Sequence, residues 1–191
     1  MAKTKAMPTL PDILDSGLSV VFCGLNPGLR AAETGHHFAG RSNRFWQAMH
    51  LAGFTPELIH PSDDREVLRY GCGLTTVVER PTARADEVSR QEFKAAHAAL
   101  ELKIAHFAPR YLAFLGKAAY CAISDQRDVS WGPQHEHFAG AAIWVLPNPS
   151  GLNRAFRLVD LVRAYRELCD AASPGGAWMA SRAPCHLVVQ S

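Results

Sequence analysis

An asparagine at position 26 stands in a loop that the sequence makes stiff. Residues 18–23 are an apolar run, and Gly24-Leu25-Asn26-Pro27-Gly28 follows it. One polar side chain among two glycines and a proline predicts a loop that holds Asn26 in a fixed place. A phosphate cradle fits less well, because the spacing is not GxGxxG, Pro27 lacks an amide hydrogen and we expect no helix to start promptly. The alternative for Asn26 is an Asx-type turn, in which the side chain bonds its own backbone.

A second loop, near the C-terminal end, combines two prolines with an apolar side chain. Residues 146–154 read Leu-Pro-Asn-Pro-Ser-Gly-Leu-Asn-Arg, so Leu152 is apolar in an otherwise polar loop and Arg154 follows closely. A stiff loop that presents an apolar side chain beside an arginine is typical of proteins that wedge open a DNA duplex. Gly151 allows another part of the backbone to approach closely. The alternative is that Leu152 packs on the last helix as a hydrophobic staple.

The composition predicts one folded domain without a strongly basic coat. The chain has 191 residues, of which 48% are hydrophobic and 20% charged, and its net charge is +2. Arginines outnumber lysines, which suits phosphate and base-edge contacts, although codon bias gives the same composition. No apolar run approaches the roughly 18 residues that a spanning helix needs, and the N-terminal residues lack an apolar signal segment. We therefore expect a cytoplasmic protein with a local basic face.

The spacing of cysteines and histidines predicts no metal site. The five cysteines form no CxxC pair, which argues against a disulfide framework and an iron–sulfur cluster. Cys23, Cys72 and Cys121 lie in apolar surroundings and are expected in the core. His135-Glu136-His137 resembles a metal pair, but no third ligand is spaced to match it. We expect those three residues in a surface turn.

Short apolar runs alternate with helical patterns along the chain. Strands are predicted at residues 18–23, 74–78, 111–115 and 143–146, and helices at 43–52, 63–70, 89–107, 116–123 and 154–169. This order predicts an α/β sandwich with a four-stranded, mainly parallel sheet and helices on both faces. Residues 11–172 form the predicted domain, between tails at 1–10 and 173–191. In such a sheet, the loops after the strands share one edge, where ligands bind.

The motifs of these loops together resemble a known family. GLNPG, TGHHFAGRSNRFW and LPNPSGLNR occur in that order, and the sequence is similar to the mismatch-specific (G·U/T) enzymes of the uracil-DNA glycosylase superfamily. The resemblance implies the same fold, a cytoplasmic monomer, double-stranded DNA with a mismatched pyrimidine as partner, and no metal or organic cofactor. Such enzymes flip a damaged base out of the duplex and hydrolyse its N-glycosidic bond.

The resemblance also assigns roles residue by residue. Asn26 matches the position that holds the attacking water; an amide orients water but cannot take its proton. The base pocket is assigned to Gly28, Ala31, Phe38 and Asn148. Among these, Phe38 stacks on the flipped base, Asn148 donates a hydrogen bond to the departing base, and Ala31 leaves room for the methyl group of thymine. The wedge and the contact with the orphan guanine are assigned to Gly151, Leu152, Asn153 and Arg154.

Asp86 is a candidate for a catalytic carboxylate. It follows the second predicted strand, and the capping box of Ser89 and Glu92 already begins the next helix without it. An ionised Asp86, kept so by Arg80 and Arg84, would activate water or stabilise the cationic sugar. The alternative is a solvated charge in the first turn of a helix.

Phosphate contacts are predicted for two basic residues, Arg44 and Lys117. Lys117 is also the lysine closest to the predicted edge, but its place at a helix start favours a phosphate contact over a Schiff base. The sequence thus predicts a monofunctional DNA glycosylase of base excision repair that uses water. A non-catalytic protein that binds mismatches or abasic sites is the alternative. A small-molecule nucleotide-binding domain is disfavoured, because its phosphate fingerprint is missing.

Overall fold

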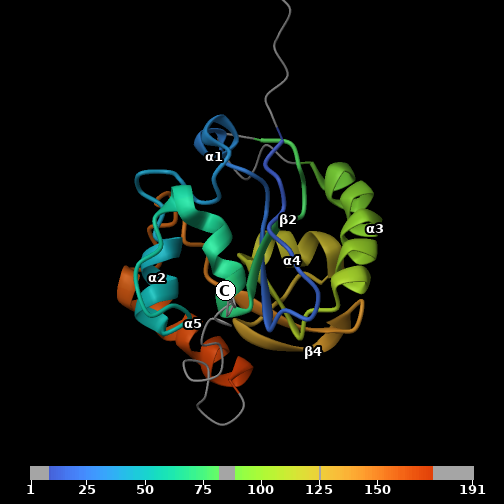
Figure 1. Ribbon diagram of the computed structural model, residues 1–191. Helices are drawn as coiled ribbons and strands as arrows, with labels where there is room; N and C mark the ends of the chain where they lie inside the picture. The colour runs from blue at the N-terminus through green and yellow to red at the C-terminus, as the bar shows by residue number, and fades with distance from the viewer. Residues whose placement is uncertain (1–8, 82–88, 125, 174–191) are drawn as a thin grey trace, which may run out of the picture.

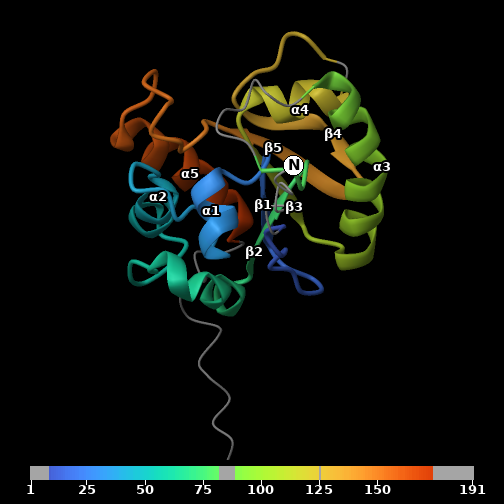
Figure 2. The ribbon, with the colours of Figure 1, turned by 90° about the horizontal axis from the view of Figure 1, so that it is seen from above.

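The protein forms a three-layer α/β/α sandwich, shown in Figures 1 and 2. The computed structural model describes residues 9–81, 89–124 and 126–173. Five strands form one sheet in the order β2-β1-β3-β5-β4. Their bounds are β1 Val20–Gly24, β2 Cys72–Thr76, β3 Tyr111–Leu115, β4 Gly132–Phe138 and β5 Ala141–Leu146. The helices are α1 Leu29–Thr34, α2 Phe45–Ala52, the 3-10 helix η1 Pro61–Tyr70, α3 Arg90–Phe107, α4 Lys117–Ser124 and α5 Leu158–Ala172.

Four of the strands are parallel, as predicted, but the sheet has a fifth strand that the sequence did not indicate. β1, β2, β3 and β5 pair in parallel, whereas β4 pairs with β5 antiparallel at the edge of the sheet. The expectation that His135-Glu136-His137 lies in a surface turn is wrong, because these residues are part of β4. Their side chains are exposed there. A polar edge strand lacks the apolar run from which buried strands are recognised.

The two faces of the sheet carry separate hydrophobic cores. Alternate strand residues point to opposite faces, so Val20 and Phe22 pack with α2, η1 and α5, whereas Val21 and Cys23 pack with α3 and α4. Figure 2 shows α2 and α5 on one side of the sheet and α3 and α4 on the other. The predicted helices on both faces are therefore confirmed.

Two helices differ from the prediction next to the site loops. α1 starts at Leu29, immediately after Gly28, although we expected no prompt helix. It has six residues and no side-chain cap, so local signals for it are weak. α5 starts at Leu158 rather than at 154, which leaves more residues to the preceding loop. The capping box of Ser89 and Glu92 is present as predicted.

Two of the three cysteines expected in the core are buried. Cys23 and Cys72 lie in it together with Phe45, Trp46 and Met49 of α2. Cys121, by contrast, is only half-buried. Across the described ranges, no helix is both long and apolar enough to cross a membrane. The predicted tails lie almost wholly outside the described residues, so the domain limits stay a prediction.

Candidate active site

The candidate site lies at the edge of the sheet formed by the carboxyl ends of the parallel strands. Figure 2 looks onto this edge, where α1 follows β1 and α4 follows β3. The loops after β3 and β5 are in direct contact there: the Gly116 amide donates to the carbonyl of Leu146 at 2.8 Å. A Cβ on Gly116 would lie 3.4 Å from Cβ of Asn148, and Gly116 has a φ of +118°. A glycine is thus required where the two loops meet.

Asn26 links the loops that follow β1 and β2. Its Nδ2 atom donates to the carbonyl of Pro27 and to that of Arg80, both at 3.2 Å. An Asx-type turn alone does not account for the contact with Arg80, which lies 54 residues away. The side chain is therefore oriented through its nitrogen by two loops. In that orientation the oxygen Oδ1 is the atom suited to accept a hydrogen bond from water.

The backbone that receives Asn26 is anchored to the start of α3. The Arg80 guanidinium donates to both carboxylate oxygens of Glu92, at 2.6 and 3.2 Å. Hydrogen bonds from Arg80 and from Ser89 lower the pKa of the Glu92 carboxyl to about 2. The predicted catalytic residue Asp86 and its neighbour Arg84 lie between these anchors, outside the described residues. Catalysis by Asp86 stays a prediction.

Gly28 and Ala31, both assigned to the base pocket, lie at the start of α1. Gly28 is the exposed N-cap residue of this helix, and its carbonyl accepts from the amide of Ala32 at 3.1 Å. Ala31 is buried one turn further. The substitution Ala31→Ser would place a hydroxyl in this buried position, where it would need a hydrogen-bond partner. Their pocket roles remain predictions.

Phe38 is held as a partly exposed ring on top of the α2 core. Its ring stacks on Phe45 with the centroids 3.9 Å apart and the planes 26° from parallel. Its φ of 56° is left-handed, a conformation that costs a side-chain-bearing residue about 1–3 kcal/mol. The ring packs against the hydrophobic core and is half-buried, so part of it remains exposed for a further stacking partner.

The preceding residue, His37, keeps Phe38 in this conformation. The His37 amide donates to Oδ2 of Asp64 at 2.8 Å, and the His37 carbonyl accepts from Nε1 of Trp46 at 3.1 Å. The imidazole Nε2 lies 2.9 Å from the carbonyl of Pro11. Burial lowers the pKa of His37, which favours the neutral ring. His37 therefore has a structural role.

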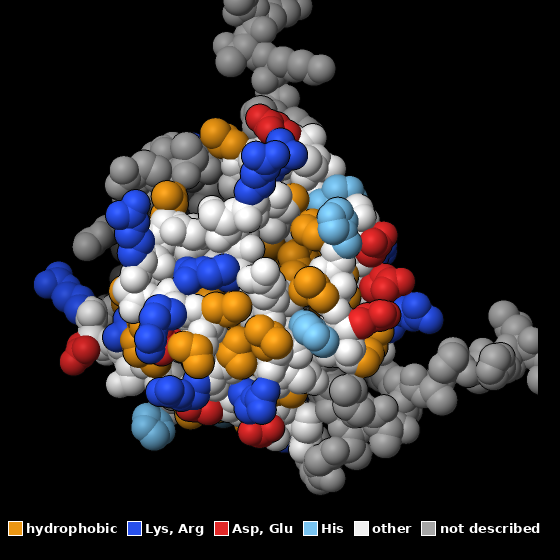
Figure 3. All heavy atoms as spheres, turned by 90° about the vertical axis from the view of Figure 1, so that its left-hand side faces the viewer, with side chains coloured by type: hydrophobic (Ala, Val, Ile, Leu, Met, Phe, Trp, Pro, Cys, Tyr) orange, Lys and Arg blue, Asp and Glu red, His pale blue; other side chains and the backbone are white. Residues whose placement is uncertain are grey.

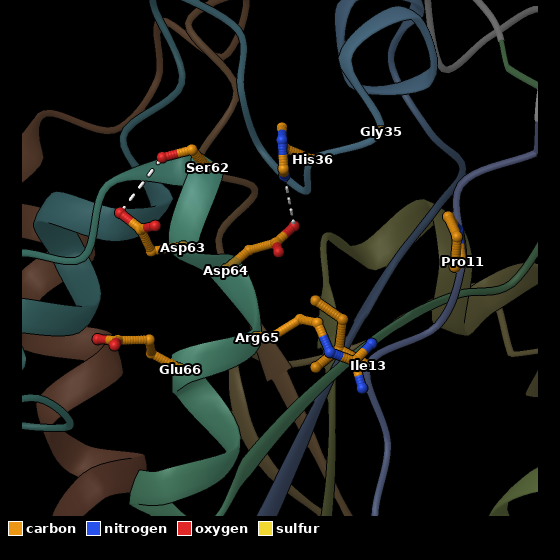
Figure 4. Close-up of a pocket in the computed structure, with 9 residues that line it drawn as sticks. All are labelled: Pro11, Ile13, Gly35, His36, Ser62, Asp63, Asp64, Arg65 and Glu66. Carbon is orange, nitrogen blue, oxygen red and sulfur yellow. Dashed lines mark hydrogen bonds and ion pairs between the residues drawn. The ribbon is translucent and has the colours of Figure 1, made fainter.

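A cavity of about 420 Å³ lies behind the His36–His37 segment, as Figure 4 shows. Its lining includes Pro11, Ile13, Gly35, His36, Asp63, Asp64 and Glu66. His36 points toward Asp64, and Nδ1 of this histidine lies 3.7 Å from Oδ2 of the carboxylate. Ser62 and Arg65 complete the lining, and none of the predicted base-pocket residues belongs to it. Within the described ranges, no group of three His, Cys, Asp or Glu is placed to hold a metal.

Asn148 is positioned by its own loop. Its Oδ1 accepts from the amide of Ser150 at 2.9 Å, and its carbonyl accepts from Nδ2 of Asn153 at 2.8 Å. No acceptor among the described residues contacts Nδ2 of Asn148, so this group can donate to a ligand. The amide of Asn153, expected at the orphan guanine, here closes the loop on itself.

The apolar side chain of this loop projects into solvent. Leu152 is 74% exposed, and α5 starts six residues later. The alternative that Leu152 is a staple of the last helix is therefore wrong. Arg154, beside it, is also exposed. An exposed leucine on a stiff loop agrees with the predicted wedge.

Arg44 holds the wedge loop, which we define as residues 147–157, against the start of α2. Its guanidinium group donates four hydrogen bonds to carbonyl oxygens of the loop, with donor–acceptor distances from 2.5 to 3.4 Å. The acceptors are the carbonyls of Pro149, Ser150, Asn153 and Phe156. At most one N–H remains for the phosphate contact that the sequence predicted. The main role of Arg44 in the structure is thus to position the loop, which charge alone did not reveal.

Gly151 allows the loop to approach its support. A Cβ at this position would lie 2.3 Å from Oγ and 2.7 Å from the carbonyl oxygen of Ser42. Both distances are shorter than any real Cβ contact, so a side chain here would displace the loop. The close approach predicted for Gly151 is confirmed, and the neighbour is the segment just before Arg44.

Trp131 contacts both Lys117 and Phe156, a residue of the wedge loop. The ammonium of Lys117 is 4.8 Å from the ring centroid of Trp131, and Trp131 meets Phe156 edge-to-face at 5.3 Å. Trp131 is 41% exposed. Neither Trp131 nor Phe156 was predicted at the site, because a single tryptophan before a polar edge strand carries no periodic signal.

Charge is unevenly distributed over the face that carries α2. On the surface shown in Figure 3, lysine and arginine side chains lie mainly on the left and lower parts, and acidic side chains gather on the right. Exposed hydrophobic side chains lie between them. This pattern agrees with a local basic face on a chain whose net charge is only +2.

Comparison with known proteins identifies the family. The model of the Uracil DNA glycosylase superfamily matches residues 11–169. Among solved structures, the chain is similar to the solution NMR structure of a candidate uracil DNA glycosylase from Methanosarcina acetivorans, with a TM-score of 0.58 and 19% identity. That match covers 85% of this chain and 98% of the other. At this identity the likeness supports the fold, and the predicted α/β class is confirmed.

Proposed function

We propose, since this chain belongs to the uracil DNA glycosylase superfamily, that it is a monofunctional enzyme that removes uracil opposite guanine. Membership of the superfamily implies a hydrolase of N-glycosidic bonds in DNA that contains uracil. The mismatch specificity is our proposal and rests on the motifs around Asn26, Phe38 and Leu152. We further propose that the enzyme acts as a cytoplasmic monomer associated with the nucleoid.

The proposed reaction uses water rather than a protein nucleophile. Asn26, oriented by the carbonyls of Pro27 and Arg80, accepts a hydrogen bond from the attacking water through Oδ1. The transition state has oxocarbenium character, and negative charge develops on the leaving base. Nδ2 of Asn148 donates to that base as a neutral group. Lys117 is not the nucleophile in this proposal, because its place at the start of α4, with its ammonium over the ring of Trp131, suits a phosphate contact better than a Schiff base.

Phe38 and Leu152 supply the duplex-opening part of the proposal. The flipped base stacks on Phe38, an interaction worth about 1–3 kcal/mol. Leu152 fills the space that the base leaves, and the orphan guanine contacts Gly151, Asn153 and Arg154. The observation that carries the proposal is the 74% exposure of Leu152 on a loop clamped at four carbonyls. An exposed leucine held this rigidly has no packing role in the free protein.

Asp86 is proposed as a carboxylate that activates water or stabilises the sugar cation.

The proposed substrate range follows from the pocket. Ala31, which has no hydroxyl to crowd a 5-methyl group, leads us to include thymine opposite guanine as a slower substrate. Bulky modified pyrimidines are candidates for the same reason.

An alkali-cleavage assay tests the proposal. Labelled duplexes with one G·U, G·T or A·U pair, and the uracil-containing single strand, are incubated with the protein and then treated with hot alkali. We expect cleavage at uracil after alkali, most for G·U. Cleavage without alkali would indicate a lyase and contradict the monofunctional mechanism. Tight binding to G·U without alkali-labile sites would favour the non-catalytic mismatch-binding alternative.

A further inference from the structure

Trp131 is an exposed aromatic residue that the proposed mechanism does not use. It immediately precedes β4 and is 41% exposed, whereas Trp46 and Trp144 are buried. No acceptor among the described residues contacts its indole Nε1. Water satisfies the exposed N–H in the free protein, so the indole offers both an apolar surface and a hydrogen-bond donor to a partner that covers it.

The position of Trp131 relates it to the wedge. Its ring meets Phe156 at 5.3 Å, and the Phe156 carbonyl accepts from Arg44 at 2.5 Å. Its other neighbour, Lys117, starts α4 next to Gly116, which contacts Asn148. Trp131 is thus linked to both ends of the wedge loop, through Phe156 near its end and through Lys117 and Gly116 to Asn148 near its start. In the proposed function, a duplex into which Leu152 inserts lies against this loop and therefore near Trp131.

The charge beside Trp131 identifies the chemistry of the partner. The Lys117 ammonium lies 4.8 Å from the ring centroid, and no carboxylate of the described residues forms an ion pair with it. An ammonium fixed by an aromatic face, next to an indole N–H, offers two donors to one anion. A DNA phosphate supplies the anion, and its deoxyribose supplies the apolar surface that the indole edge needs.

We infer that Trp131 and Lys117 together bind a backbone phosphate and sugar of the DNA duplex that flanks the flipped base. This inference rests on the proposed function for the orientation of the duplex. It assigns Trp131 as a DNA contact and gives the predicted phosphate contact of Lys117 a structural basis. The pair contacts DNA outside the pocket, so it acts on binding and not on the choice of base.

Tryptophan fluorescence tests the contact directly, with undamaged duplex DNA as the probe. The difference in emission between the wild type and Trp131→Phe isolates residue 131 from the other indoles. We expect saturating duplex to lower acrylamide quenching of this difference signal at least about twofold. Phenylalanine keeps the packing on Phe156, so the measurement does not depend on a variant that loses its fold. Equal quenching with and without DNA would overturn the inference.

The salt dependence of binding tests the phosphate contact. Each phosphate contact contributes about 0.9 to the slope of log K against log salt concentration. We expect Lys117→Gln to lower the slope by about this amount and Trp131→Ala to weaken binding about fivefold or more. Arg69→Gln, at the opposite edge of the sheet, and Leu102→Ala, 74% exposed on α3, are the matched controls. If the Lys117 and Trp131 variants had the salt slope and affinity of the wild type, the proposed contact of these two residues with the DNA backbone would be refuted.

The same preparations separate this inference from the proposed function. If the wild type binds duplex and protects Trp131 but releases no uracil, the proposed function fails and the contact stands. If uracil is released normally while Trp131 remains equally quenched, the contact fails and the proposed function stands.

Discussion

Replacement of Arg44 by lysine distinguishes a loop clamp from a phosphate contact. Both residues carry one positive charge, so a phosphate contact would survive largely intact. The clamp would not, because an ammonium has three donors on a flexible stem, whereas the Arg44 guanidinium reaches four carbonyls of the wedge loop. We therefore expect Arg44→Lys to lose most of the wedge function while binding of undamaged DNA keeps its salt dependence.

The size of the effect follows from the number of bonds lost. A lysine at this position keeps at most one or two of the four hydrogen bonds. The loop is partly exposed, so water replaces each lost donor in part, and about 1 kcal/mol per bond is appropriate. Loss of two or three bonds then costs the ordered loop about 2–3 kcal/mol, which corresponds to about 30- to 150-fold in its population. Arg44→Met, which removes all four bonds and the charge, should cost the loop more than Arg44→Lys, and a salt slope near that of the wild type would show that Arg44 is not a phosphate contact.

Single-turnover excision from G·U duplex and from uracil-containing single strand measures this effect. The clamp predicts a loss of this order for Arg44→Lys on duplex and a much smaller loss on single strand, which needs no wedge. Arg157→Lys is the matched control, because that exposed arginine lies in the same loop but pairs with Asp160. Wild-type rates of Arg44→Lys on both substrates would refute the clamp. An equal loss on both would point to a general effect on the fold.

Substitutions of four other residues separate the roles proposed for the site. Asn26→Ala should lower G·U excision at least about 10-fold with duplex binding unchanged; an unchanged single-turnover rate would contradict its water-orienting role. Asp86→Asn should slow excision about 10- to 10³-fold and abolish the decline at low pH; a pH profile equal to that of the wild type would make it a solvated helix-entry charge. Leu152→Ala should weaken excision from duplex more than from single strand, and parallel losses would contradict the wedge. Asp64→Leu should lower stability by about 1–3 kcal/mol and weaken base capture, because it leaves the His37 amide unpaired. Asp64→Asn, which keeps an acceptor, is its control, and equal effects of the two variants would refute this account.

The elements that sequence reasoning found are those that bury apolar residues. The four parallel strands and the helices α2 and α3 carry periodic apolar patterns, and each lies within a few residues of its predicted position. β4 was missed because only its ends, Gly132 and Phe138, are buried, while the residues between them are largely polar. α1 was missed because its six residues need no cap and derive their support from the loops around them.

At the site, the type of a residue is visible in the sequence, whereas its role depends on neighbours that the fold provides. An apolar residue in a polar loop sufficed to predict the exposed position of Leu152. Arg44 was predicted to bind phosphate because its charge is visible in the sequence, whereas the four carbonyls that surround it are set by the fold. The structural role of His37 is hidden in the sequence for the same reason, since its partners Asp64 and Pro11 are distant in the chain. Sequence spacing predicts which loops meet, but backbone acceptors become visible only in three dimensions.

Three consecutive residues at the start of α2 fix the two parts of the machinery that must act together. Arg44 clamps the wedge loop, Phe45 stacks under Phe38, and Trp46 donates to the carbonyl that precedes Phe38. The ring of Phe38, proposed to receive a flipped base, and Leu152, proposed to replace that base in the stack, are therefore both held by one helical turn. Because Phe45 and Trp46 are buried against the sheet, that turn cannot shift without disrupting the core. Wedge insertion and base capture need a fixed separation along the duplex, and a shared rigid support provides it before DNA binds, which lowers the ordering cost of binding.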